Sequence, residues 1–170
     1  MKKVGTKIIS PPEVLNHPSK GCILSDRGLK TLIGVTFPPG ITTLDVSYND
    51  LENLQGCPSD ITHLFCYNNQ LTDFDGASKS LIHIDAHSNP ITSSKGLENC
   101  PNIKDVCMYM CDLKEVNGFP NTICILNVAK NKITSIINLP SSCKEFLYTT
   151  NPLPDEFLNK TVDELRSLIY

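Results

Sequence analysis

The chain has 170 residues, enough for one domain with a buried core, and a formal net charge of −3 with an isoelectric point of about 5.8. This mild charge and the lack of a Lys/Arg block give no basis for nucleic-acid binding. No stretch approaches the ~18 apolar residues of a membrane helix, and the basic start MKK is not followed by the apolar run of an export signal. We therefore expect neither a nucleic-acid nor a membrane partner.

Eight cysteines are distributed through the chain without the paired C-x-x-C spacing of a zinc ribbon. A disulfide framework is typical of small exported domains, whereas this chain is not small and has no recognisable export signal. We expect reduced cysteines in an intracellular, cytoplasmic protein.

The first 40 residues, 1–40, share little with the rest of the chain. GLKTLIGVTFPPGI has the proline spacing of a degenerate repeat copy, and we expect Leu24, Leu32 and Val35 to be buried. A terminal repeat is atypical because one of its sides has no neighbour. We predict an N-terminal cap with one degenerate repeat here.

From residue 41 to residue 153 the sequence repeats itself at intervals of 20 residues, with one interval of 22. The copies fit L-x-x-L-x-L-x-x-N-x-L, and apolar residues recur at positions 1, 4, 6 and 11. One such turn cannot bury its apolar edge alone, so the copies must stack into a solenoid. The six copies are ITTLDVSYNDL, ITHLFCYNNQL, LIHIDAHSNPI, IKDVCMYMCDL, ICILNVAKNKI and CKEFLYTTNPL, which start at 41, 61, 81, 103, 123 and 143.

These segments resemble leucine-rich repeats, over residues 41–153. The short copies with a proline before the next strand are similar to those of bacterial effector proteins, and the 22-residue copy resembles the short intracellular subclass. Asn-, Lys- and Ile-rich repeats of this kind are also common in giant DNA viruses, so the composition fits a viral origin. A viral protein would be located in the host cell or in the virion. The resemblance implies an α/β repeat solenoid with a curved parallel sheet on its concave face and an irregular or 3-10 convex side.

Position 9 of the copies is Asn in all but one, where it is Cys111. In the family this Asn points inward and bonds the turning backbone of adjacent coils, and Cys is also accepted there. A tight turn leaves buried backbone groups that must be paired. We therefore interpret the column as structural and not as a set of ligands.

Residues 154–170 change to a helical pattern, with Leu158, Val162, Leu165 and Ile169 on one face. Thr161 and Glu164 have the spacing of a capping box. We predict a C-terminal capping helix over the open end of the last coil. Bacterial effectors of the resembling type often carry a ubiquitin-ligase domain after their repeats, whereas only these seventeen residues follow here.

Alternation along each short strand points positions 3, 5 and 7 outward, with position 8 at the rim. The first four copies place aromatic and histidine side chains at these positions, where the repeat fold requires none. Clustered aromatics are typical of protein-binding surfaces. We predict a protein or peptide partner bound through Tyr48, His63, Phe65, Tyr67, His83, Asp85, His87 and Tyr109.

Two alternatives remain. His63, His83 and Asp85 could converge on a zinc ion, with His87 or Asp105 as a further ligand, although an open sheet spreads its side chains and the repeat already explains their spacing. The protein could also be a structural or assembly component, such as a virion protein, held through its edges or caps. No phosphate loop, G-x-S-x-G or H-E-x-x-H is present, so we expect no catalytic residues, no cofactor and no enzyme.

Overall fold

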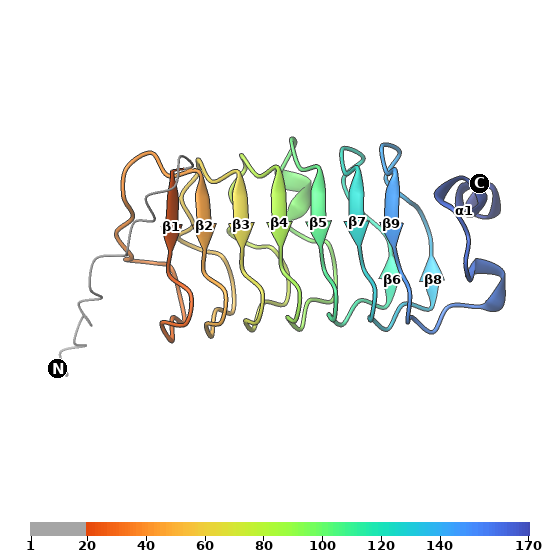
Figure 1. Cartoon of the computed structure of the whole chain (residues 1–170), viewed down its shortest axis with the longest axis horizontal. Coiled ribbons are helices and arrows are strands. Elements are labelled where there is room, and N and C mark those ends of the chain that lie inside the picture. The colour runs from red at the N-terminus through yellow and green to blue at the C-terminus, as the bar shows by residue number, and fades with distance from the viewer. Residues whose placement is uncertain (1–19) are drawn as a thin grey trace.

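The computed structural model describes residues 20–170 as a solenoid whose successive turns stack along one axis (Figure 1). One short strand from each turn joins a seven-stranded sheet with the order β1-β2-β3-β4-β5-β7-β9, and every pairing is parallel. The strands are β1 (Gly21–Ile23), β2 (Thr43–Asp45), β3 (His63–Phe65), β4 (His83–Asp85), β5 (Asp105–Cys107), β7 (Ile125–Asn127) and β9 (Glu145–Leu147).

The strand register follows the sequence repeat. Leu64 pairs with Leu44 on one side and Ile84 on the other, and all three occupy position 4 of their copies. The 22-residue interval keeps this register, and a 3-10 helix, η1 (Leu97–Asn99), lies within it, so the extra residues lie outside the strands. Equivalent positions therefore form columns along the solenoid, which is the stacking that the repeat predicts.

The core runs along the inside of the coil. Positions 4, 6 and 11 are buried in all six copies. Each buried aliphatic side chain stabilises the fold by roughly 1.5–3 kcal/mol before entropy is counted. Because each turn packs on the next, these side chains form one continuous cluster. Among its fully buried members are Leu44, Val46, Leu51, Leu64, Leu71, Ile84, Ile91, Val106 and Leu126.

The asparagine column bonds adjacent turns together. The Asn69 amide donates to the carbonyl oxygens of Val46 and Cys66, each at 3.0 Å, and its own oxygen accepts the amide N–H of Leu51 at 2.9 Å. Each Asn thus joins its own turn to the preceding one and pairs backbone groups that the bend leaves without partners. The structural interpretation is confirmed for Asn49, Asn69, Asn89, Asn131 and Asn151.

Two backbone positions carry a left-handed conformation through the repeats. Position 8, the third residue after each strand, has φ between 53° and 60° from Tyr48 through Thr150 although none of its residues is glycine. Position 16 is glycine in four successive copies, at Gly56, Gly76, Gly96 and Gly118. A Cβ on the first three would lie under 3 Å from the backbone of the preceding turn, so those turns pack backbone to backbone.

A second, two-stranded parallel sheet that the sequence does not predict lies on the opposite side of the coil. It comprises β6 (Glu115–Val116) and β8 (Ser135–Ile136), with Val116 and Ile136 pointing into the core. The other turns are irregular on this side. These two-residue strands form because the stacking of adjacent turns brings their backbones into hydrogen-bonding register. They are too short to show an alternating pattern in the sequence.

The N-terminal turn is more regular than the sequence suggests, because β1 adds a strand to the sheet beside β2. Leu24 and Leu32 are buried as expected, whereas Val35 is only partly buried against the core. Position 9 of this turn is Arg27, and the Asn49 side-chain oxygen accepts its backbone N–H at 3.0 Å. The part of the predicted cap at residues 1–19 lies outside the described residues.

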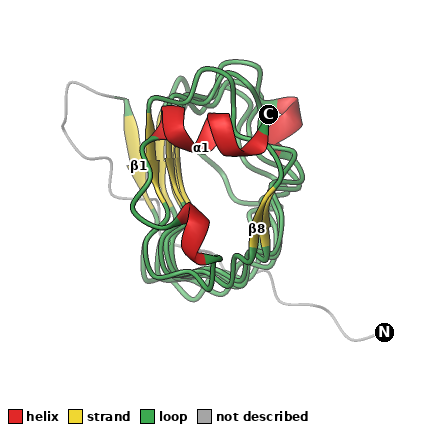
Figure 2. Cartoon of the chain, turned by 90° about the vertical axis from the view of Figure 1, so that its right-hand side faces the viewer, coloured by secondary structure: helices red, strands yellow, loops and turns green. Residues whose placement is uncertain are grey.

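The C-terminal helix α1 (Val162–Ile169) crosses the open end of the coil, with the large sheet on one side and β8 on the other (Figure 2). The capping box is confirmed, since Thr161 and Glu164 exchange side-chain and backbone hydrogen bonds. Leu165 is fully buried, whereas Leu158 is 42% exposed, so its predicted place on the buried face is wrong. The 3-10 helix η2 (Asp155–Phe157) ends at Leu158, and Phe157 packs on the core instead.

Hydrogen bonds attach α1 and the segment before it to the last turns of the solenoid. Arg166 of α1 donates to the carbonyl oxygens of Pro140, Ser141 and Cys143 at 3.3, 3.1 and 2.8 Å, groups that have no further turn to bond. The Tyr148 hydroxyl bonds the backbone of the connecting segment. Within residues 20–170, no helix combines the length and apolar character needed to cross a membrane.

Candidate partner-binding face

The eight predicted residues all lie on the outward side of the seven-stranded sheet or at its rim, which we call the strand face. The strands β2, β3, β4, β5 and β7 each bury their middle residue and leave the two flanking residues partly or fully exposed. Tyr48 at the rim is 57% exposed. The register then determines which side chains become neighbours on this face.

One group of contacts centres on His83. Its ring lies 5.9 Å from the ring of His63 in a stacked arrangement and 5.5 Å from that of Phe65. The Nδ1 atom of His83 lies 3.0 Å from a carboxylate oxygen of Asp105 on the next strand. His63 Nδ1 lies 3.0 Å from the Thr62 hydroxyl. These rings therefore hold each other in place across β3, β4 and β5.

A second group follows position 7 and the rim. The rings of Tyr48 and Tyr67 meet edge to face with centroids 5.4 Å apart. Tyr67 stacks on His87, with centroids 4.4 Å apart and planes 10° from parallel. Further along, the ammonium of Lys130 lies 5.1 Å from the centroid of the Tyr109 ring. The predicted residues thus form two groups of packed rings on neighbouring turns, with the Tyr109–Lys130 pair beyond them.

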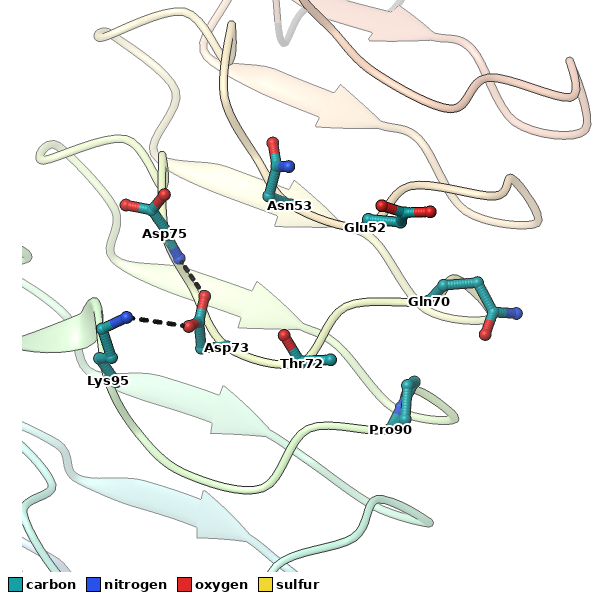
Figure 3. A pocket seen from close by; sticks show the side chains of 8 residues that line it. All are labelled: Glu52, Asn53, Gln70, Thr72, Asp73, Asp75, Pro90 and Lys95. Atoms are coloured by element: carbon teal, nitrogen blue, oxygen red, sulfur yellow. Dashed lines mark hydrogen bonds and ion pairs between the residues drawn. The ribbon is translucent and has the colours of Figure 1, made fainter.

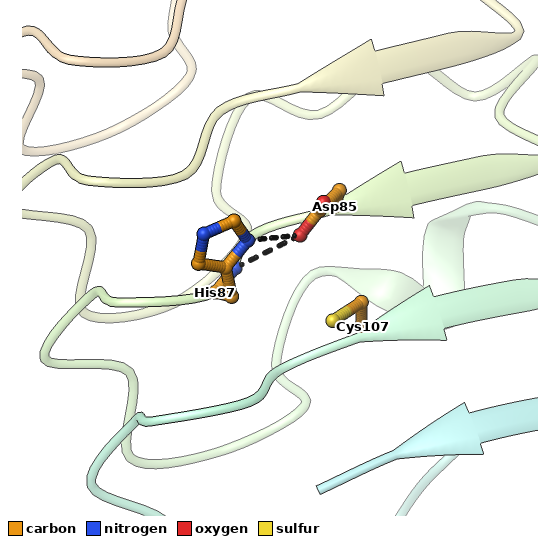
Figure 4. A group of neighbouring side chains, drawn as sticks. All are labelled: Asp85, His87 and Cys107. Atoms are coloured by element: carbon orange, nitrogen blue, oxygen red, sulfur yellow. Dashed lines mark hydrogen bonds and ion pairs between the residues drawn. The ribbon is translucent and has the colours of Figure 1, made fainter.

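The metal-ligating side chains do not converge as the sequence suggests. His83 pairs with Asp105, and the group whose donor atoms lie within 4.8 Å of one another is instead Asp85, His87 and Cys107 (Figure 4). The His87 ring turns back toward its own strand, so that Nδ1 lies 2.7 Å from Asp85 Oδ1. Strand alternation alone places His87 two residues beyond Asp85. The orientation of the His87 side chain brings its ring back to the Asp85 carboxylate. Cys107 is the member that the predicted site omits, although the pairing of equivalent positions indicates it.

A cysteine, a histidine and an aspartate in one group invite comparison with a nucleophilic triad. A catalytic thiol needs a lowered pKa so that the thiolate is present. Here burial, followed by the nearby Asp85 carboxylate, raises the pKa of the Cys107 thiol to about 12, against a lowering hydrogen bond from the Tyr109 backbone. The electrostatics therefore disfavour an activated nucleophile at Cys107.

A polar pocket of about 600 Å³ lies away from this face, between successive turns (Figure 3). Two of its three carboxylates are already engaged, since Lys95 lies 3.2 Å from Asp73 and the Gln55 amide donates to Asp75 at 2.8 Å. It is open and is lined by no aromatic side chain. The strand face is therefore the stronger candidate.

Repeated parallel strands, a bonded asparagine column and a capping helix define the fold as a leucine-rich-repeat solenoid. Among solved structures it is similar to YopM from Yersinia enterocolitica WA-314, with a TM-score of 0.60 and 23% sequence identity over 69% of this chain. The matched region spans 26% of YopM, so the likeness concerns the fold. No protein-family model and no curated protein sequence matches the chain.

Proposed function

We propose that the protein binds another protein or a peptide through the strand face of β2 to β5. The observation that carries this proposal is the run of mutually packed rings from Tyr48 through Tyr67 to His87, beside the group around Phe65. Aromatic side chains offer large contact areas and lose little conformational freedom on binding.

Rigidity supports the same function. Each strand position is set by backbone pairing on both sides, and several rings are stacked before any partner arrives. A pre-ordered surface loses less entropy on association, so more of the contact free energy appears as affinity. None of the stacked rings is needed for the repeat core, which is complete beneath them.

The test is capture of partners from the native host with the wild-type protein and with the double variant Phe65→Ala and Tyr67→Ala. Leu147→Ala is the matched control, because Leu147 is 50% exposed and lies in β9 at the far end of the same sheet. We expect partners that the wild type and the control retain and the double variant loses, with all three proteins equally folded by circular dichroism.

Capture that survives the double change would refute binding through the strand face. Capture that depends instead on Ile137, which is 48% exposed next to β8, would favour a structural or assembly component held through its other surfaces. We also propose an intracellular location, which the eight free thiols support because disulfides are rare in reducing compartments.

A further inference from the structure

We propose that Asp85, His87 and Cys107 form a zinc-binding site on the strand face, a property beyond the proposed partner binding. The three side chains come from two adjacent strands. Asp85 of β4 pairs directly with Cys107 of β5, and His87 follows two residues after Asp85. Thiolate, imidazole and carboxylate are the three ligand types that zinc accepts, and the thiolate disfavours magnesium or calcium.

The geometry fits a tetrahedral ion with small movements. Zinc bonds of about 2.0–2.3 Å place neighbouring ligand atoms roughly 3.3–3.7 Å apart in a tetrahedron. The donor atoms here lie within 4.8 Å of one another, and Nδ1 of His87 is 2.7 Å from Oδ1 of Asp85. The ion enters between them if that pair opens by under about 1 Å and the wider pairs close by up to about 1.5 Å. Three protein ligands leave the fourth position for water.

The surrounding contacts hold the ligands in place without the ion. Stacking on Tyr67 restricts the orientation of the His87 ring, and the backbone N–H of His87 donates to Asp85 Oδ1 at 3.2 Å. Asp85 and His87 side chains are 23% and 28% exposed, so the group is shielded from water but open to an entering ion. Metal sites gain affinity when outer contacts orient their ligands in this way.

Zinc binding at this site changes no oxidation state and needs no oxidant or reductant. The Cys107 thiol releases its proton to solvent as the zinc–sulfur bond forms, and the Asp85 carboxylate binds without a proton change. Zinc bonds Nδ1 of His87, and the bound imidazole is neutral with its proton on Nε2.

The test uses cobalt(II) as a spectroscopic probe of the full-length protein, purified without a metal-affinity tag. A thiolate ligand gives a sulfur-to-cobalt charge-transfer band, and a tetrahedral site gives intense visible ligand-field bands. We expect both bands to saturate at about one cobalt per chain and to disappear when zinc displaces cobalt.

Cys107→Ser should abolish the charge-transfer band, whereas the matched control Cys124→Ser, at another half-buried cysteine, should retain it. His87→Gln keeps the thiol and should weaken cobalt binding, which covers the case in which Cys107→Ser fails to fold. A wild-type protein without the band, or a band that survives Cys107→Ser, would refute the site. Phe65 is not a ligand and does not stack on His87, so the single variant Phe65→Ala tests partner binding separately, whereas Tyr67→Ala affects both sites.

Discussion

At the scale of single residues, the inward-facing asparagines show how the repeat determines structure. The position was predictable because one residue type recurs in phase and because a buried turn must pair its backbone groups. Orientation on the strand face was not predictable to the same degree. The turn of the His87 ring toward Asp85 depends on its stacking with Tyr67, a contact between side chains of different copies.

Replacing Asn69 by Ala should lower the free energy of unfolding by about 2–3 kcal/mol. The Leu51 amide would lose its acceptor, and the carbonyl groups of Val46 and Cys66 would each lose one of the donors that reach them. Chemical denaturation measures this change, which corresponds to a melting temperature lower by roughly 4–12 °C. The exposed neighbour Gln70→Ala is the control and should change stability by under about 0.5 kcal/mol. Equal losses in the two variants would contradict a structural role for the column.

At the scale of elements, the strands form where equivalent residues of adjacent turns pair, and this explains both the successes and the misses of prediction. β2 to β9 of the large sheet coincide with copies that the pattern identifies. β1 was not predicted because its turn has Arg27 at position 9, where the other turns have Asn or Cys. The backbone of this turn nevertheless pairs with β2 as the other turns do. No recurring residue pattern indicates β6 and β8, because only the stacking of adjacent turns pairs them.

The glycines at position 16 permit a test of how closely the turns pack. A Cβ on Gly76 would lie 2.4 Å from the Gln55 nitrogen and 2.5 Å from the Leu54 carbonyl carbon, whereas on Gly118 the nearest atom would be Ser94 Oγ at 3.5 Å. Both glycines have positive φ, at 84° and 71°. Gly118→Ala should therefore cost only the left-handed strain of about 1–2 kcal/mol. Gly76→Ala adds a backbone clash of about 1–3 kcal/mol, giving a total of about 2–5 kcal/mol.

Denaturant unfolding of Gly76→Ala and Gly118→Ala, measured side by side, gives the difference between their losses of unfolding free energy. Because the two positions share the same place in the repeat and similar backbone angles, the difference between them isolates the close approach of adjacent turns. Indistinguishable losses would mean that the turns can separate by about 1 Å without cost.

At the scale of the whole molecule, a solenoid is a linear array in which each turn is stabilised by its immediate neighbours. Residue patterns therefore predict the architecture well, since one turn determines the next. They predict the ends less well, because an end is determined by whatever closes it. Leu158 illustrates this point: it continues the helical spacing in the sequence, but the chain bends at Asn159, where φ is 56°, and leaves Leu158 outside the buried face.

Removing residues 159–170 should loosen the array from its C-terminal end only. The deletion takes away Leu165, which is fully buried, and the Arg166 guanidinium that bonds three carbonyl oxygens of the last turn. The Glu145 amide, which donates to Cys124 at 3.1 Å, should then exchange its hydrogen at least about tenfold faster. The His83 amide, which donates to Thr62 at 3.0 Å in the middle of the array, should keep its protection.

Hydrogen exchange read by mass spectrometry or nuclear magnetic resonance distinguishes these amides, and deletion of the 80%-exposed Tyr170 alone is the control. The reason for a local effect is that opening the last turn breaks one interface, whereas opening the middle breaks two. If exchange accelerates equally at β4 and β9, the solenoid unfolds as a single cooperative unit and α1 stabilises all of it. If only β9 responds, α1 acts as a cap whose influence ends within a turn or two, and the strand face of β2 to β5 keeps its geometry independently of that end.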